Sequence, residues 1–251
     1  MKRLSVFLLP LAVACGHPSP VAPDAAAVKY TTIAEESDRT DEDKALDAGR
    51  HPVQLLELAR VQPGMNVADL AAGSGYTTEL LARAVAPTGK VYAQNPEMFI
   101  KFIGERWPER LARPANQNVV RVDREMESPL PPEAKELDVV IANLVYHDFV
   151  WMGVDRTAMN RAVLASLKRG GSYIVIDHAA AKGHGVDDVK ALHRIEEESV
   201  IAEVTRAGFK LENKGEFLRN PEDTRDWSTS PSTVGEKRGT SDRFALRFIR
   251  P

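Results

Sequence analysis

The segment from Val67 to Val85, VADLAAGSGYTTELLARAV, constrains the fold more than any other part of the sequence. It has the pattern of a short apolar strand that contains one acidic residue, two glycines separated by one residue, and a helix. Glycines at a strand-to-helix turn let the main chain adopt unusual dihedral angles and approach a ligand closely. The segment therefore predicts a ligand-binding turn after the first strand of an α/β sheet.

Apolar, β-branched segments alternate with helical segments along the rest of the chain. Strands are expected at residues 66–70, 90–95, 118–123, 137–143, 172–177, 209–217 and 243–249. Helices are expected within residues 41–61, 77–86, 96–106, 155–167 and 187–207. Strands of this kind predict a parallel sheet buried on both faces, and the last two, which have no helix between them, are expected to pair antiparallel. The predicted fold class is α/β: a doubly wound, mostly parallel seven-stranded sheet with an antiparallel edge strand.

The first 40 residues have a different character. Lys2 and Arg3 precede an apolar stretch of eleven residues, which has the layout of a secretory signal and is too short to span a membrane. Small residues then lead into Cys15, the only cysteine, and resemble a bacterial lipoprotein cleavage site. We expect residues 1–15 to be a lipoprotein-type signal peptide, 16–40 a flexible tether and 41–251 the folded domain. The protein is then expected on the periplasmic side of the bacterial envelope, touching the membrane only through the lipid on Cys15.

Three ligand classes compete for the glycine turn. A dinucleotide site has a third glycine where this chain has Thr78, and the carboxylate of Asp69 would repel a phosphate bound beside it. A phosphate-binding loop needs a lysine followed by Ser or Thr, which this turn lacks. S-adenosylmethionine carries positive charge instead, and a charged hydrogen bond to Asp69 would contribute about 1.5–3 kcal/mol.

The stretch VADLAAGSGY resembles the first motif of class I S-adenosylmethionine-dependent methyltransferases. The resemblance extends over roughly residues 41–251 through the PGM lead-in and the segments LDVVIANLVYHD, LKRGGSYIVIDH and AGF. More narrowly, DHAA, LHRIEEE and RGTSDRF resemble a group of exported bacterial proteins described as predicted methyltransferases. The resemblance implies the fold and S-adenosyl-L-methionine as the cofactor, and it leaves the methyl acceptor open.

The resemblance also implies which residues bind the cofactor. They are Asp69, Ala71, Gly73, Gly75, Tyr76, Asn95, Asp123, Asn143 and Leu144. Asn95 departs from the family, which usually has an acidic residue here that holds both ribose hydroxyls; an amide can bond the ribose without the charge. Asp123 falls where the family often contacts the adenine amino group, and Asn143 and Leu144 fall beside the reacting methyl group.

Each implied contact has a structural alternative. Asp69 is also suited to capping the following turn, and Asn95 followed by Pro96 is ordinary helix-start chemistry. Asp123 is equally suited to an ion pair with Arg124.

The segment after the fourth strand carries the catalytic candidates. Tyr146, His147 and Asp148 are expected to lie over the methyl group, with His147 as a general base that Asp148 orients. Alternatively, His147 hydrogen-bonds a neighbouring loop and the aromatic residues only cover the pocket.

Further histidines follow at positions 178, 184 and 193. Their spacing matches no zinc pattern, and we predict no metal site.

These observations predict an exported, lipid-anchored methyltransferase that acts on an unidentified small-molecule acceptor. The net charge of −3 and the lack of a basic segment argue against a nucleic-acid partner. The alternative is a catalytically inactive, methyltransferase-like domain that binds an envelope ligand. The sequence leaves the oligomeric state open.

Overall fold

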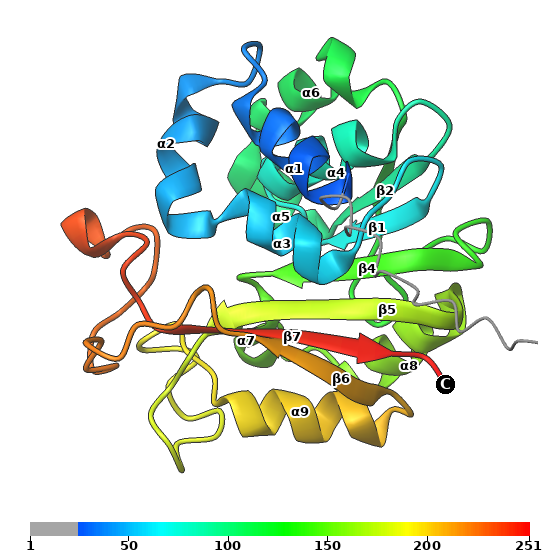
Figure 1. Ribbon diagram of the computed structural model, residues 1–251. Helices are drawn as coiled ribbons and strands as arrows, with labels where there is room; N and C mark the ends of the chain where they lie inside the picture. The colour runs from blue at the N-terminus through cyan, green and yellow to red at the C-terminus, as the bar shows by residue number, and fades with distance from the viewer. Residues whose placement is uncertain (1–24) are drawn as a thin grey trace, which may run out of the picture.

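The computed structural model describes residues 25–251, in which a seven-stranded sheet lies between two layers of helices (Figure 1). The strands are β1 (Asn66–Leu70), β2 (Lys90–Asn95), β3 (Val119–Asp123), β4 (Leu137–Asn143), β5 (Leu167–His178), β6 (Lys210–Gly215) and β7 (Arg243–Ile249). Their order is β3-β2-β1-β4-β5-β7-β6, and β7 runs antiparallel to both of its neighbours. The predicted doubly wound sheet, with antiparallel pairing of the last two strands at one edge, is confirmed.

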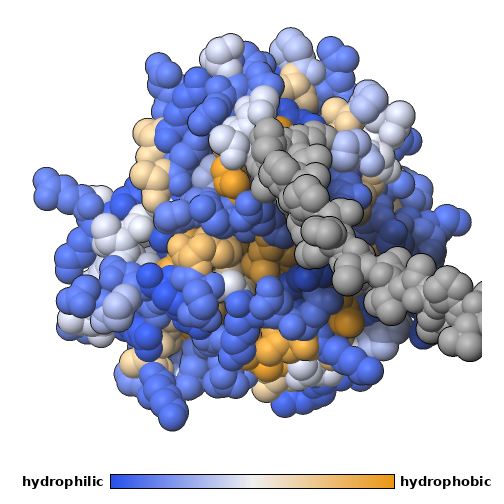
Figure 2. Space-filling model, in the orientation of Figure 1, coloured by the Kyte–Doolittle hydropathy of each residue, from blue (hydrophilic) through white to orange (hydrophobic). Residues whose placement is uncertain are grey.

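Helices cover both faces of this sheet. The helices are α1 (Ala25–Glu35), α2 (Asp41–Arg50), α3 (Pro52–Ala59), α4 (Tyr76–Val85), α5 (Glu97–Ile103), α6 (Arg106–Leu111), α7 (Tyr146–Trp151), α8 (Arg156–Ser166) and α9 (Glu197–Arg206). Side chains from α1, α3 and α4 share one hydrophobic cluster with the sheet, and side chains from α7, α8 and α9 share the other. The surface of the face shown in Figure 2 is mostly hydrophilic, with apolar side chains gathered in a band across its middle.

Alternating side chains of the central strands supply both clusters. In β1, Val67 points to the α3 and α4 side, whereas Ala68 and Leu70 point to the α7 and α8 side, and all three are fully buried. Burial on both faces explains why these strands are apolar along their whole length. Removal of a Leu or Val side chain from water contributes about 1.5–3 kcal/mol, so this central layer fixes where the strand ends lie.

Two predicted helices are interrupted. The helix expected within residues 41–61 is split at His51, whose φ is 48°, because Pro52 disfavours helical dihedral angles at the residue before it. The helix expected at 96–106 is split at Gly104, whose φ is 60°.

A third predicted helix is much shorter than expected. Only Glu197–Arg206 of residues 187–207 is helical, and the preceding residues form turns. Val189 and Ile195 still reach the core from these turns. In the sequence, Val189 and Leu192 have the spacing of a helix face, although His193, with a φ of 52°, ends any regular helix there.

The folded part of the chain begins before the predicted domain boundary. In α1, Ile33 is buried against α3 and α4, and the hydroxyl of Tyr30 donates to the carbonyl of Val61 at 2.6 Å. The segment expected to be a tether, residues 16–40, is therefore folded from Ala25 onward. The predicted signal peptide and Cys15 lie outside the described residues, and no helix within 25–251 is long and apolar enough to cross a membrane.

A long loop, residues 216–242, joins β6 to β7. In Figure 1 this loop, orange to red, lies at the carboxyl end of the parallel strands, on the same side as α2. The two segments touch, because a Cβ placed on Gly49 would come within 2.8 Å of the Gly239 Cα. Ligands of doubly wound sheets bind at this end of the strands.

Candidate functional site

The glycine turn after β1 has three residues with left-handed dihedral angles. Ala71, Gly73 and Gly75 have φ values of 46°, 57° and 87°. A Cβ built on Gly73 would meet no atom within 4 Å, so the space beside this residue is open. That opening fits a ligand that approaches the main chain.

A glycine is required at position 75 for a different physical reason. A Cβ on Gly75 would lie 2.7 Å from the Cγ of Arg110 and 3.0 Å from the ring of Trp107. Gly75 is therefore needed because α6 packs closely against the turn, and the structure gives it no open space comparable to that at Gly73.

Two amide side chains from the end of β2 hold the turn. The Oδ1 atom of Asn95 accepts the Gly73 N–H at 2.9 Å, and its Nδ2 donates to the Gly73 carbonyl at 3.1 Å. Gln94 accepts the Ala71 N–H at 2.9 Å and donates to the Arg124 carbonyl at 2.6 Å. Both side chains are fully buried. Asn95 thus braces the turn with both ends of its amide, a task that a carboxylate, which has no donor, cannot perform.

A buried ion network fixes the outer side of the turn. The guanidinium of Arg110 donates to the carbonyl of Ser74 at 3.0 Å, to Glu79 at 2.6 Å and to Asp43 at 2.9 Å. Glu79 is 2% exposed and also binds Arg83 at 2.8 Å. Because each buried carboxylate has a paired cation, the network orders α2, α4 and α6 around the turn.

Asp69 and Arg50 place opposite charges beside the turn. Asp69 is buried in β1, and one carboxylate oxygen accepts the hydroxyl of Thr78 at 2.6 Å. Burial raises the pKa of Asp69 to about 7, against the opposing effects of Thr78 and the Arg50 charge. A cation close to this carboxylate would restore its ionised form.

Arg50 is the last residue of α2 and is half-buried. Its guanidinium lies 4.4 Å from the centre of the Tyr76 ring, and within the described part of the chain it makes no hydrogen bond or ion pair. Burial lowers the pKa of Arg50. The Tyr76 hydroxyl in turn donates to Asp47 at 2.6 Å. Arg50 is therefore a held cation with donors free to bind an anionic group.

The other predicted cofactor residues lie at neighbouring strand ends. Asp123, at the end of β3, is 43% exposed and pairs with Arg121 at 2.8 Å, and not with Arg124 as the structural alternative had it. Asn143, at the end of β4, donates to the hydroxyl of Thr77 at 3.0 Å. Leu144 has a φ of 59°, and its N–H donates to the carbonyl of Ile176 at 2.7 Å. These residues thus lie at the carboxyl ends of the parallel strands, as their positions in the sequence predict.

His147 lies between two carboxylates. Its Nδ1 is 2.7 Å from Asp177, which is fully buried, and its Nε2 is 3.2 Å from Asp148. Burial opposes protonation, but the two carboxylates outweigh it and raise the pKa of His147 to about 10. A histidine that keeps its proton at neutral pH is a poor general base, so this geometry does not favour the role predicted for it.

Tyr146 has a place unlike the one predicted. It is fully buried, its hydroxyl donates to Glu203 of α9 at 2.9 Å, and it accepts from Asn160 of α8 at 2.8 Å. From the first residue of α7, the Tyr146 side chain thus reaches both α8 and α9. These contacts support a packing role and not the predicted catalytic one.

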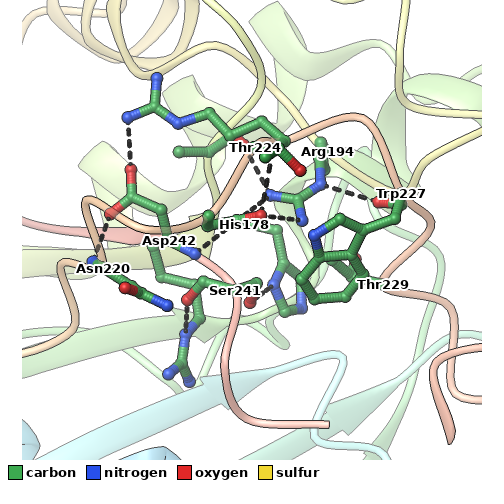
Figure 3. A network of polar contacts seen from close by, with 12 residues as sticks. His178, Arg194, Asn220, Thr224, Trp227, Thr229, Ser241 and Asp242 are labelled. Carbon is green, nitrogen blue, oxygen red and sulfur yellow. Dashed lines mark hydrogen bonds and ion pairs between the residues drawn. The ribbon is translucent and has the colours of Figure 1, made fainter. Parts of the chain in front are cut away.

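The remaining histidines occupy different environments. His178 bonds Ser241 of the long loop at 2.7 Å, and burial lowers its pKa well below the ordinary value (Figure 3). His184 pairs with Asp188 at 2.8 Å and is 52% exposed. His193 reaches His147, with 3.2 Å between its Nδ1 and the Nε2 of His147.

Sequence reasoning missed several residues of this site. Arg50 looked like an ordinary basic residue in a last helical turn, and Gln94 like one more strand residue. Arg110 gave no local pattern either, because its role depends on contacts across the fold. The DH pair at the end of β5 was the one available signal for Asp177.

Comparisons with known proteins agree with this architecture. No family model matches the chain. A 69-residue part is 44% identical to protein-L-isoaspartate O-methyltransferase of Aeropyrum pernix, and the match covers 28% of this chain and 25% of that protein. The chain thus spans about a quarter of the length of this curated relative.

Solved structures match much more of the chain. An S-adenosylmethionine-dependent methyltransferase from Aquifex aeolicus covers 90% of this chain and 98% of its own, with a TM-score of 0.58 and 16% identity. Aeropyrum pernix fibrillarin, solved with natively bound S-adenosyl-L-methionine, covers 77% of this chain and 74% of its own, with a TM-score of 0.50 and 14% identity. At these identities the likeness concerns the fold. The chain therefore has the Rossmann-like fold of the S-adenosylmethionine-dependent methyltransferases.

Proposed function

We propose that this protein is an S-adenosylmethionine-dependent methyltransferase. The observation that carries the proposal is the pair of opposite charges, Asp69 and Arg50, beside the open space at Gly73. The amino-acid end of S-adenosylmethionine bears an ammonium and a carboxylate, and such a pair suits both. When bound, this cofactor supplies an activated methyl group that a nucleophile displaces directly.

The chain's own residues would hold and orient that cofactor. Asp69 would favour the ammonium and Arg50 the carboxylate, each through a charge-assisted hydrogen bond. Asn95 is fully buried, so it would act on the cofactor indirectly, by holding the main chain of Gly73 beside the open space. Asp123 would bind the adenine amino group by giving up part of its exposed pairing with Arg121, and Ala71, Tyr76, Asn143 and Leu144 would shape the cleft.

The acceptor in this proposal is a small molecule, and nucleic acid is not a partner. The net charge of −3 gives no general attraction for a polyanion, and the sheet and its two helical layers account for the described chain without an added recognition domain. The likeness to an isoaspartate methyltransferase covers too little of either chain to carry that enzyme's acceptor over.

Methyl transfer from labelled S-adenosylmethionine into an envelope extract tests the acceptor class. We expect label in the small-molecule fraction with the wild type and much less with Asp69→Asn at a limiting concentration of S-adenosylmethionine. Label found only in protein or nucleic acid would overturn the small-molecule acceptor.

We also propose that the protein belongs to the exported bacterial group and is lipid-anchored through Cys15 on the periplasmic side of the envelope. The support is in the sequence: two basic residues, eleven apolar ones, and small residues before the cysteine. Fractionation tests this. The wild type should enter the membrane fraction and Cys15→Ser should leave it, whereas wild-type protein in the cytoplasm would refute export.

The second candidate is a domain that binds an envelope ligand without methylating it. The observation that favours it is Asn95, because this residue lacks the charge with which the family usually holds the ribose. A domain of that kind would bind S-adenosylmethionine weakly or not at all.

A further inference from the structure

Three potential metal ligands converge beside the end of β4. They are Nε2 of His147, Oδ1 of Asp148 and Nδ1 of His193. The distance from His147 to His193 is 3.2 Å, from His147 to Asp148 3.2 Å, and from His193 to Asp148 3.6 Å. Two ligands of one tetrahedral metal, each about 2.1 Å from it, are about 3.4 Å apart. The three atoms therefore already stand at the mutual spacing that one ion requires.

A single point satisfies all three distances. A circle through the three atoms has a radius of about 1.9 Å, so a point about 0.8 Å above its centre lies about 2.1 Å from each atom. No ligand atom has to move to reach a normal bond length.

The buried carboxylate of Asp177 orients the first ligand. One of its oxygens is 2.7 Å from Nδ1 of His147, and the other accepts the His147 main-chain N–H at 2.7 Å. Asp177 therefore holds the proton of Nδ1, and a bound metal ion would displace the proton of Nε2, the atom that faces Asp148 and His193. Metal-binding histidines almost always have such a carboxylate or carbonyl partner.

The other two ligands are held as well. The indole N–H of Trp151 donates to the same Oδ1 atom of Asp148 at 2.7 Å, and this bond fixes the carboxylate. His193 has a φ of 52°, which is unfavourable for a residue other than glycine. The local strain indicates that surrounding contacts set the position of this histidine.

Those contacts come from the long loop (Figure 3). Thr229 donates to the carbonyl of His193 at 2.7 Å. The next residue, Arg194, is fully buried, pairs with Asp223 at 2.8 Å and donates to the carbonyl of Trp227 at 3.1 Å. The loop thus clamps both sides of the peptide that carries His193.

We propose that His147, Asp148 and His193 bind a divalent transition-metal ion. Two imidazoles and one carboxylate suit zinc, iron, cobalt or nickel, whereas magnesium and calcium prefer oxygen ligands. Three protein ligands leave at least one position open for water or for an oxygen or nitrogen atom of a small molecule. The site goes beyond the proposed methyl transfer and stands on these side chains alone.

Cobalt binding to the untagged, chelator-treated protein tests the site. We expect one equivalent of Co²⁺ to bind, with visible absorption bands and competition by Zn²⁺. His193→Ala and Asp148→Asn should each weaken binding about 100-fold or more, and Asp177→Asn about 10- to 100-fold. His184→Ala is the matched control, because His184 is exposed and its ring pairs with Asp188, and it should bind as the wild type does.

Two results would overturn the proposal: no stoichiometric binding of Co²⁺ or Zn²⁺, or binding that His193→Ala leaves unchanged. His193 is 24% exposed on its side chain, so its replacement is expected to leave the fold intact, which circular dichroism checks. The assay contains no cofactor, so its failure would leave the methyltransferase proposal standing, and failure of cofactor binding would leave the metal site standing.

Discussion

Replacement of Asp69 by asparagine should stabilise the free protein and weaken cofactor binding. The buried carboxyl has a pKa of about 7, against an ordinary value of 3.8. Each pKa unit corresponds to about 1.4 kcal/mol, so the ionised form costs up to about 4 kcal/mol at a pH well above 7. An asparagine side chain would avoid this cost. Its amide donor, if left without a hydrogen-bond partner, would destabilise the variant by about 1–3 kcal/mol, which offsets part of the gain.

The effect on stability has a defined pH window. The folded state keeps the proton of Asp69 up to about pH 7, whereas the unfolded state loses it near pH 3.8. Between these values the unfolded state binds fewer protons, so the Asp69 contribution to stability is present at low pH and is lost as the pH rises to 7. Asp69→Asn should therefore gain stability over the wild type with rising pH, reaching roughly 1–3 kcal/mol at pH 8.

Urea unfolding of both proteins between pH 4 and 8, paired with calorimetric binding of S-adenosylmethionine, measures both effects. The variant should bind about 10- to 100-fold more weakly, because it lacks the charge-assisted bond. Wild-type affinity should rise from pH 5.5 to 7 as Asp69 ionises. The reasoning is refuted if the difference in stability is constant with pH, or if the variant binds the cofactor as tightly as the wild type does.

Three further substitutions separate the roles of neighbouring residues. Arg50→Gln should weaken binding of S-adenosylmethionine about tenfold or more and leave adenosine, which has no carboxylate, unaffected in the same titration; equal losses for both would contradict the carboxylate role. Asn95→Asp should lower the free energy of unfolding by about 1–3 kcal/mol, because it places a carboxylate oxygen against the Gly73 carbonyl oxygen in place of a donor, and it should not improve affinity for S-adenosylmethionine. A variant that is as stable as the wild type in denaturant titration and binds the cofactor more tightly would show that the contact of Asn95 with Gly73 is unimportant. Tyr146→Phe should cost about 1–3 kcal/mol through the lost bonds to Glu203 and Asn160 while cofactor affinity stays within about twofold; a large loss of affinity at unchanged stability would restore a role in the site.

The sequence predicted the sheet well because the strand pattern depends on local chemistry. Apolar β-branched runs such as residues 137–143, separated by helices and turns, correspond to strands buried on both faces. The helix expected at 187–207 was wrong in its first half, because Val189 and Leu192 have the spacing of a helix face although they lie in turns.

Sequence reasoning could locate the residues of the candidate site only where they lie at or directly after the carboxyl end of a strand. Asp69, Gly73 and Asn95 lie at the carboxyl ends of β1 and β2 or in the turn between β1 and α4, and the fold brings them together. Tyr146 was misplaced because the direction of a side chain in the first turn of a helix depends on packing against α8 and α9.

The contacts across the fold were beyond local patterns altogether. His193 approaches His147 because Thr229, 36 residues further along the chain, holds its main chain through a hydrogen bond. The charge of Arg50 acts on Asp69 because α2 ends near the carboxyl ends of the strands. The spacing of residues along the sequence predicts neither of these proximities.

Calorimetric titration of the purified protein with S-adenosylmethionine, with NAD⁺ in a parallel cell, tests the central claim most directly. Our account, in which the turn after β1 binds a cationic nucleoside with an amino-acid end, predicts that S-adenosylmethionine binds at micromolar concentration to one site per chain. It predicts that NAD⁺ does not bind. Absence of any S-adenosylmethionine binding at millimolar concentration, or tighter binding of NAD⁺, would contradict the account.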